Sequence, residues 1–423
     1  MSTETHTPTL EPQLCRRALE ALRAGVPNRD AVRLLTPLHK RATEEFEKAL
    51  RSIEEDSKAR GMVITGGFGS GKSHLLEYLR HLGIESHFVC SRVTLSKETP
   101  LSDLTKVLRS AISSATLPDR VGPALAELAE GFSADKAPGW AEFFQWVHRT
   151  PELDPRFGAT LTLFERLAST DEELSEKILA DWQGFSMKLS ELRGALKSLG
   201  SDSDYTLGRP QKNQELLRFA FLTRFFKALG YTGWVILLDE AELISRYGLR
   251  ARGKAYAHLA QLLGLNEDSR IPGLLVVSAI TDDYAGEVLH RRGDRLKVPD
   301  KMELAGELPA KIEDAKRGIA AIETTNLSVQ VPGREQVRQT HDTLQAVYAA
   351  AYDWQPPSLA DTLEYAGSTR MRQYVRAWIT LWDLKRLYNY TGETVTDSVK
   401  LSYDEDKDIE QVAAEDDGPF GPD

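Results

Sequence analysis

The chain has little cysteine and no long apolar run. Only Cys15 and Cys90 occur among 423 residues, and two isolated cysteines form neither a zinc motif nor a disulfide framework. No run of about 18 apolar residues is present, so we expect no membrane span. The first residues, MSTETHTPTLEPQL, have no basic segment followed by an apolar one, so we expect no secretory signal. These absences predict a protein of the reducing cytoplasm.

The chain also lacks an excess of positive charge. Its net charge is −10, and residues 401–423 contribute −8, with nine acidic residues and one lysine. The other 54 acidic and 52 basic residues nearly balance, which gives no support for nucleic-acid binding but leaves room for a local basic face. The histidines are scattered and show no pair with metal-ligand spacing. We expect the acidic tail, residues 396–423, to be disordered.

A glycine-rich segment, GGFGSGKS, is the most informative stretch. An apolar run, Gly61–Thr65, predicts a buried strand before it, and leucines at helical spacing predict a helix after it. The segment fits the phosphate-loop pattern G-x-x-x-x-G-K-[ST], in which backbone N–H groups and a helix N-terminus bind phosphate. We expect Lys72 to reach the β- and γ-phosphates of ATP and the Ser73 hydroxyl to bind Mg²⁺. The predicted nucleotide-binding residues are Gly66, Gly67, Phe68, Gly69, Ser70, Gly71, Lys72, Ser73 and His74.

Two acidic residues end another apolar strand, WVILL. Because ligands bind at the carboxyl ends of parallel strands, we expect Asp239 to hold Mg²⁺ and Glu240 to polarise the attacking water. Glu242 is the alternative base. An adjacent glutamate favours hydrolysis over phosphate transfer to a small acceptor.

The strand predicted over Gly273–Ile280 ends in polar residues. We assign Thr281 to the γ-phosphate or the attacking water, because it stands where the apolar run stops. A threonine that caps the following helix fits the pattern equally well.

Two arginine clusters follow this strand. Arg292, with Arg291 and Arg295 as substitutes, is the candidate for an arginine supplied to a neighbouring subunit, and Arg370 is the candidate for an arginine of the same subunit. Each cluster also fits an ordinary solvated face.

The remaining pattern predicts an α/β fold with a parallel sheet. We expect strands at Gly61–Thr65, His87–Val93, Trp234–Glu240, Gly273–Ile280 and Met302–Leu308, and helices from Ile312 to Tyr390. The predicted segments are an N-terminal helical segment (1–35), an ATPase core (36–310) with a helical insertion (about 95–215), a C-terminal helical lid (311–395) and the acidic tail (396–423).

The order of these motifs resembles AAA+ ATPases of the origin-recognition branch. Four stretches more specifically resemble the ATP-binding proteins of BREX-type bacteriophage-defence systems. They are ALEALRAGVPNRDAV from Ala18, GGFGSGKSHLLEYLR from Gly66, SKETPL from Ser96 and GWVILLDEAEL from Gly233.

The resemblance implies a P-loop NTPase core of the AAA+ type, a helical lid and nucleotide-dependent assembly of a homo-oligomer. It also implies a helicase-like partner and DNA, with Val26, Pro27 and Asn28 packed by the adenine and Arg370 in the lid. The expected function is therefore Mg²⁺-dependent ATP hydrolysis that drives assembly or remodelling in a phage-defence complex. The alternatives are a regulatory switch that remodels protein partners without DNA, and a scaffold that binds ATP but barely hydrolyses it.

Overall fold

A computed structural model gives the architecture of the chain. It describes residues 10–24, 28–35, 39–56, 58–67, 70–118, 120, 122–130, 132–167, 170–200, 205–208, 214–267, 270–324, 326–330, 332–359 and 371–391. Of the predicted site residues, Val26, Pro27, Phe68, Gly69 and Arg370 lie outside this part, as does the acidic tail.

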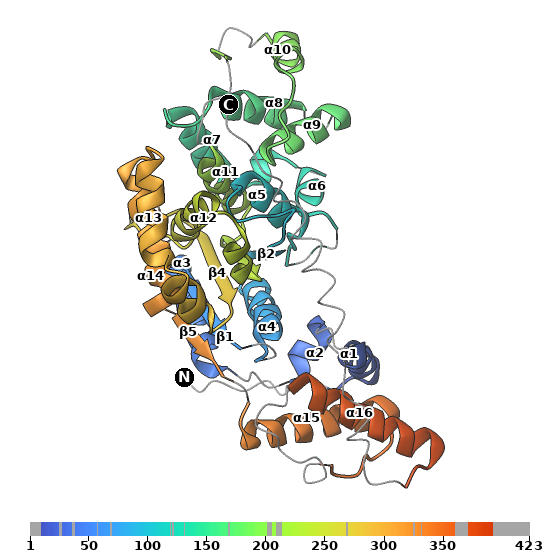
Figure 1. Cartoon of the computed structure of the whole chain (residues 1–423). Coiled ribbons are helices and arrows are strands. Elements are labelled where there is room, and N and C mark those ends of the chain that lie inside the picture. Colours follow the sequence, from blue (N-terminus) through green and yellow to red (C-terminus); the bar gives the residue numbers. More distant parts are fainter. Residues whose placement is uncertain are drawn as a thin grey trace.

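The core is a five-stranded parallel sheet in the order β2-β3-β4-β1-β5 (Figure 1). Its strands are β1 (Met62–Gly66), β2 (Val89–Thr94), β3 (Trp234–Asp239), β4 (Leu274–Ile280) and β5 (Asn326–Val329). Every residue of β3 and β4 is buried, as the continuous apolar runs predict for strands that are covered on both faces. The predicted α/β fold with a P-loop-type parallel sheet is confirmed.

The fifth strand is not where the sequence places it. Met302–Leu308, predicted as a strand, belongs to helix α13 (Asp294–Leu304) and to the turn that follows it. Met302 is buried, and its sulfur approaches Gly253 of a neighbouring helix, whereas Leu304 and Leu308 are exposed, so this segment has a helical burial pattern. The actual fifth strand, Asn-Leu-Ser-Val, is short and half-polar, and it interrupts the run of helices predicted from Ile312 onward.

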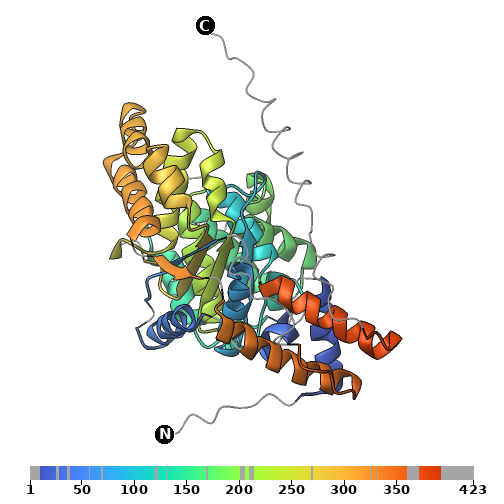
Figure 2. The same cartoon turned by 60° about the horizontal axis from the view of Figure 1, so that its bottom comes forward.

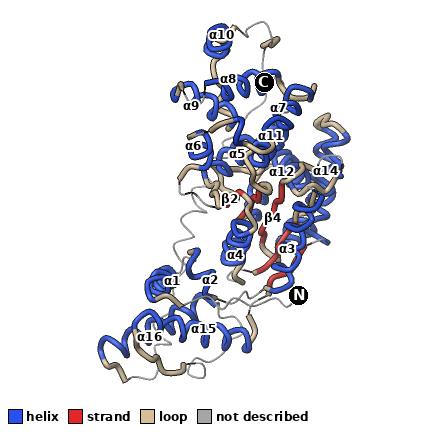
Figure 3. The backbone as a smooth tube through the Cα atoms, turned by 180° about the vertical axis from the view of Figure 1, so that it is seen from behind, coloured by secondary structure: helices blue, strands red, loops and turns tan. Residues whose placement is uncertain are grey.

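Helices cover both faces of the sheet (Figure 3). On one face lie α3 (Lys40–Asp56) and α4 (Lys72–Glu85), which enclose an apolar layer with β1, β3 and β4. On the other lie α11 (Glu215–Ala228), α12 (Leu249–Leu262) and α14 (Pro309–Thr324). Because α14 and β5 complete this core, the core extends past residue 310, where the sequence placed the start of the lid.

The insertion is helical, as the sequence predicts. It contains α5 (Leu104–Ser113), α6 (Ala124–Ala129), the 3₁₀ turn η1 (Ala134–Lys136), α7 (Trp140–Arg149), α8 (Pro155–Leu167), α9 (Glu172–Trp182) and α10 (Leu189–Ser198). Its aromatic side chains pack directly on α11: the ring centroids of Trp182 and Phe164 lie 5.2 and 5.9 Å from that of Phe225. The insertion therefore shares one hydrophobic core with the sheet domain.

The two ends of the described chain form a second unit. Helices α1 (Pro12–Ala24), α2 (Arg29–Leu34), α15 (Arg334–Tyr352) and α16 (Met371–Tyr388) enclose their own hydrophobic core (Figure 2). A half-buried ion pair joins them, because Arg23 donates to both oxygens of Asp383 at 2.7 and 2.9 Å. The N-terminal helices thus pack with the C-terminal helices of the predicted lid.

None of the helices in the described ranges has the length and apolarity needed to cross a membrane.

Candidate nucleotide site

The phosphate loop connects β1 to α4, as predicted. Ser70 N donates to Gly67 O at 3.1 Å, which closes a tight turn. A Cβ at Gly66 would lie 2.5 Å from Ser70 Oγ and 2.8 Å from Val329 O, so only glycine fits there. Gly71 has φ +95°, a conformation that favours glycine, immediately before the first turn of α4. At Gly66 and Gly71, therefore, the loop has no side chain that would block a close approach.

Lys72 lies over this loop. Its ammonium group donates to Gly66 O at 2.6 Å and to Gly67 O at 3.3 Å. Ser73 follows it in the first turn of α4. The Ser70 hydroxyl is buried and has no hydrogen-bond partner among the described residues. A lysine, a free hydroxyl and a helix N-terminus are the donors that a triphosphate requires, so the residues present fit ATP.

The acidic pair stands at the same edge of the sheet. Strand β4 lies between β1 and β3, and Thr65 pairs with Ile280 while Leu238 pairs with Ser278. This register places Thr281, which directly follows β4, between the phosphate loop and Asp239. The sequence predicted these three motifs separately, and the sheet brings them together.

Glu240 has an unusual backbone conformation. Its φ and ψ of 62° and 36° are left-handed, which costs a non-glycine residue about 1–3 kcal/mol. The conformation turns the chain sharply out of β3 and into the 3₁₀ helix η2 (Ala241–Arg246), and it leaves Glu240 exposed. Strain of this kind is typical of functional sites.

Asp239 is buried, and both of its carboxylate oxygens accept hydrogen bonds. Oδ1 accepts from Glu240 N at 3.1 Å, and Oδ2 accepts from Arg92 at 2.8 Å. Mg²⁺ commonly uses one or two protein ligands together with substrate phosphates, so Ser73 and Asp239 suit it. The sequence analysis gave Arg92 no role, although it is an arginine within the predicted strand HFVCSRV, and that was a visible signal.

Asp282 was also missed. Its carboxylate lies against the phosphate loop, 3.5 Å from the point where a Cβ atom would stand if Gly67 had a side chain. Thr281, the residue chosen from the sequence, is buried, and its carbonyl oxygen accepts from Tyr284 N at 3.4 Å. An acid beside the phosphates would repel them unless a cation lies between.

Glu242 is a half-buried acid next to this site. Burial, followed by the negative charge of Glu240, raises the pKa of Glu242 to about 7. Its Oε2 is buried and has no hydrogen-bond partner in the described part of the chain. Glu242 therefore remains the alternative base that the sequence suggested.

Two histidines contact the loop or its helix. His39 Nε2 lies 3.1 Å from Ser70 O, which anchors the loop to the residue before α3. Burial, together with the neighbouring His39, lowers the pKa of His74 to about 4, so His74 is neutral at pH 7. His74 was assigned to the nucleotide segment, whereas His39 was not.

The arginine candidates lie away from the loop in the described chain. Arg292 is exposed and donates to Ser245 O of η2 at 3.2 Å. Arg291 pairs with Glu287 at 2.8 Å, and Arg295 pairs with Glu323 at 2.9 Å. These contacts of Arg291, Arg292 and Arg295 therefore assign none of these three described residues to the nucleotide.

On the expected adenine side, Asn28 caps α2. Its Oδ1 accepts from Ala31 N at 2.8 Å, as its position predicts. Helix α2 packs on α4, the helix that follows the phosphate loop (Figure 1). This packing brings the N-terminal unit next to the site.

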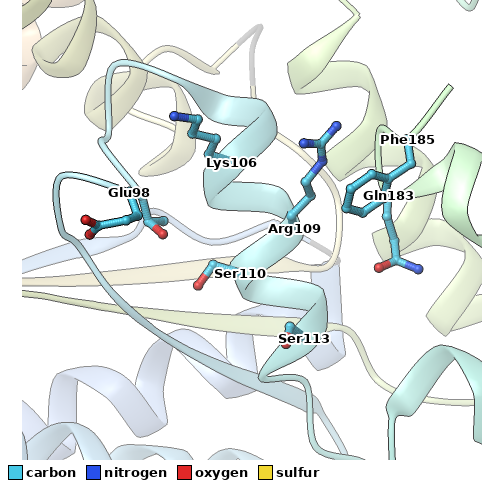
Figure 4. Close-up of a pocket in the computed structure, with 8 residues that line it drawn as sticks. Glu98, Lys106, Arg109, Ser110, Ser113, Gln183 and Phe185 are labelled. Atoms are coloured by element: carbon cyan, nitrogen blue, oxygen red, sulfur yellow. The ribbon is translucent and has the colours of Figure 1, made fainter.

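The stretch Ser96–Leu101, to which the sequence gave no role, borders an open pocket of about 460 Å³ (Figure 4). Lys106 and Arg109 of α5 and Phe185 of the turn after α9 line it as well. The Arg109 guanidinium lies 3.9 Å from the Phe185 ring centroid and donates to Gly184 O at 2.6 Å. Leu95 N donates to Asp239 O at 3.0 Å, so the loop that borders this pocket begins beside the acidic strand end.

Comparison with known proteins identifies the family. A family profile described as "BREX system ATP-binding protein BrxC/D" matches residues 11–136 and 211–299. The first segment contains the phosphate loop and Arg92, and the second contains Asp239, Glu240, Thr281 and Arg292. No curated protein matches the chain. Since the profile covers half of the chain, including both chemical motifs, the chain belongs to the BREX system ATP-binding protein BrxC/D family.

Proposed function

We propose that this protein hydrolyses ATP with Mg²⁺ and that hydrolysis drives assembly or remodelling in a BREX defence complex. The observation that supports this most directly is that the phosphate loop and the Asp239–Glu240 turn meet at one edge of the parallel sheet. Membership of an ATP-binding family supports the first half of the reaction, and the exposed, strained Glu240 supports the second.

In this mechanism the chain supplies three actions. Backbone N–H groups of the loop, the N-terminus of α4 and Lys72 bind the triphosphate. Ser73 and Asp239 hold Mg²⁺, which neutralises phosphate charge when it is bound. Glu240 accepts the proton of the attacking water, and Thr281, at the end of β4, contacts that water or the γ-phosphate.

Two substitutions test this function. We expect Lys72→Ala to abolish ATP hydrolysis and to weaken ATP binding strongly, because the triphosphate loses its main cation. We expect Glu240→Gln to bind ATP normally but to hydrolyse it at least about 10²-fold more slowly. Isothermal titration and phosphate release measure the two quantities. Normal turnover by Glu240→Gln would exclude Glu240 as the base, and the same assay on Glu242→Gln then tests the alternative.

We also propose that the active form is a homo-oligomer in which Arg292 completes a neighbouring site. An exposed arginine whose side chain donates to a backbone carbonyl of its own chain can reach another subunit. Arg292→Ala and Lys72→Ala subunits, each inactive alone, should regain part of the turnover when mixed, since some interfaces would pair an intact Lys72 with an intact Arg292. Arg370 is proposed to act within its own subunit, so a mixture of Arg370→Ala and Lys72→Ala subunits should stay inactive.

Action on DNA together with a helicase-like partner is the finer form of this proposal. The overall charge gives this form no support, because residues 1–400 carry 54 acidic and 52 basic side chains, and the alternative is a switch that remodels protein partners without DNA. A gel shift over a series of salt concentrations separates the two. Binding that weakens steeply with salt supports DNA contact, and an absence of binding at low salt supports the alternative.

A further inference from the structure

Asp239 stands at one end of a chain of charged groups that reaches the phosphate-loop helix. One guanidinium nitrogen of Arg92 donates to Asp239 Oδ2 at 2.8 Å, and the other lies 3.5 Å from Glu77 Oε2. Arg80 pairs with Glu77 at 2.7 Å and donates to the Thr116 hydroxyl at 3.1 Å. Acid and base thus alternate from Asp239 through Arg92 and Glu77 to Arg80.

The register of the sheet explains how these groups meet. Arg92 pairs with Leu237 in the neighbouring strand, two residues before Asp239, so Arg92 and Asp239 project from the same face. That face is covered by α4. On α4, Glu77 lies four residues after Ser73, so it stands one helical turn beyond the proposed magnesium ligand. Arg92 therefore lies between the two elements that carry the proposed ligands.

Two carboxylates of this charged chain are buried, so each depends on its charged partner. Asp239 is 4 % exposed and Glu77 is 7 % exposed. A buried carboxylate requires a partner, and a planar guanidinium can bond two carboxylates at once in fixed directions. The bond from Arg92 to Oδ2 restrains rotation of the Asp239 carboxylate.

We infer that Arg92 is a positioning residue for metal binding. Arg92 orients the Asp239 carboxylate and links it through Glu77 to α4, the helix that carries Ser73. The inference rests on the proposed function, because it assumes that Asp239 and Ser73 hold Mg²⁺. It adds that the metal site depends on a residue of β2 that touches neither nucleotide nor metal.

The test measures how much Mg²⁺ strengthens the binding of a non-hydrolysable ATP analogue. The dissociation constant is determined with Mg²⁺ and with EDTA, and the ratio of the two is the metal enhancement. Loss of a residue that orients a metal ligand typically weakens metal binding about 10–100-fold, so we expect Arg92→Gln to reduce the enhancement by that factor. The dissociation constant in EDTA should not change, because the phosphate loop is intact.

Further variants distinguish orientation from charge. Arg92→Lys keeps the charge but cannot bond both acids with one planar fork, so we expect a similar loss. Adding Arg92→Gln to Asp239→Asn should cause no further loss, because Arg92 acts through Asp239. The matched control is Arg156→Gln, which breaks a buried 2.6 Å pair with Asp181 in the insertion. It should lower the melting temperature without changing the enhancement.

Each outcome supports or overturns the role inferred for Arg92. A stronger enhancement in Arg92→Gln would show that Arg92 competes with the metal, and an unchanged enhancement would show that it does not orient Asp239; either result overturns the inference. If Arg92→Gln fails to fold, Arg92→Lys supplies the same comparison. If the wild-type protein binds the analogue with no enhancement by Mg²⁺, or does not bind it, the proposed function itself fails.

Discussion

Glu242 should make the stability of this protein fall as the pH rises. Burial, and then the charge of Glu240, raises the pKa of Glu242 from 4.5 to about 7. The folded protein therefore holds this proton more tightly than the unfolded chain does, so the free energy of unfolding decreases as the pH rises through this interval. At about 1.4 kcal/mol for each pH unit between the two pKa values, the full loss is about 3 kcal/mol.

Glu242→Gln removes the ionisation and nearly preserves the shape. Above pH 7 we expect the variant to be more stable than the wild type by about 1–3 kcal/mol, the lower figure allowing for solvent that reaches a half-buried group. The gain should shrink as the pH falls toward 4.5 and vanish below about pH 3.5, where Glu242 is protonated in both states.

Urea denaturation of the nucleotide-free protein in EDTA, at several pH values from 5 to 8, measures this difference. The variant must be compared with the wild type at each pH, because His74 contributes a pH dependence of opposite sign over part of the range. The control is Glu173→Gln on the exposed surface of α9, which should change stability by less than about 1 kcal/mol at every pH. A stability difference for Glu242→Gln that stays constant with pH would refute the reasoning.

Three further predictions follow from single contacts. His74→Gln should lose less stability than the wild type when the pH falls from 7 to 5. In the wild type the unfolded chain takes up a proton on His74 near pH 6.5, whereas the folded protein does not, because its pKa for His74 is lowered. Equal losses in a denaturation series would contradict this. Asp282→Asn should bind an ATP analogue about 5-fold more tightly in EDTA, since it removes a negative charge beside Gly67; unchanged affinity in a titration would place the carboxylate away from the phosphates. Arg23→Ala should destabilise the packing of α1 on α16 by about 1–3 kcal/mol, because it deletes a two-bond ion pair with Asp383. Limited proteolysis should then cleave the variant faster near α1, and an unchanged pattern would argue against this role.

The phosphate loop, the acidic strand end and the four apolar strands were predictable because each depends on a short contiguous stretch. The phosphate-loop contacts are local: Gly71 allows the left-handed backbone before α4, and Lys72 bonds back to Gly66 and Gly67. Runs such as WVILL specify a fully buried parallel strand by composition alone. The cap that Asn28 forms on α2 is equally local, because capping requires only the next three residues.

The tertiary structure decided which distant residues share an environment. Strand β5 is too short and too polar to be recognised, and it exists because its backbone pairs with β1. Arg92 and Glu77 reach Asp239 only through strand order and the packing of α4, and Asp282 reaches Gly67 only because β4 lies beside β1. Sequence patterns report local conformation and burial, whereas these contacts depend on long-range pairing and on the directions of individual side chains, which no local pattern contains.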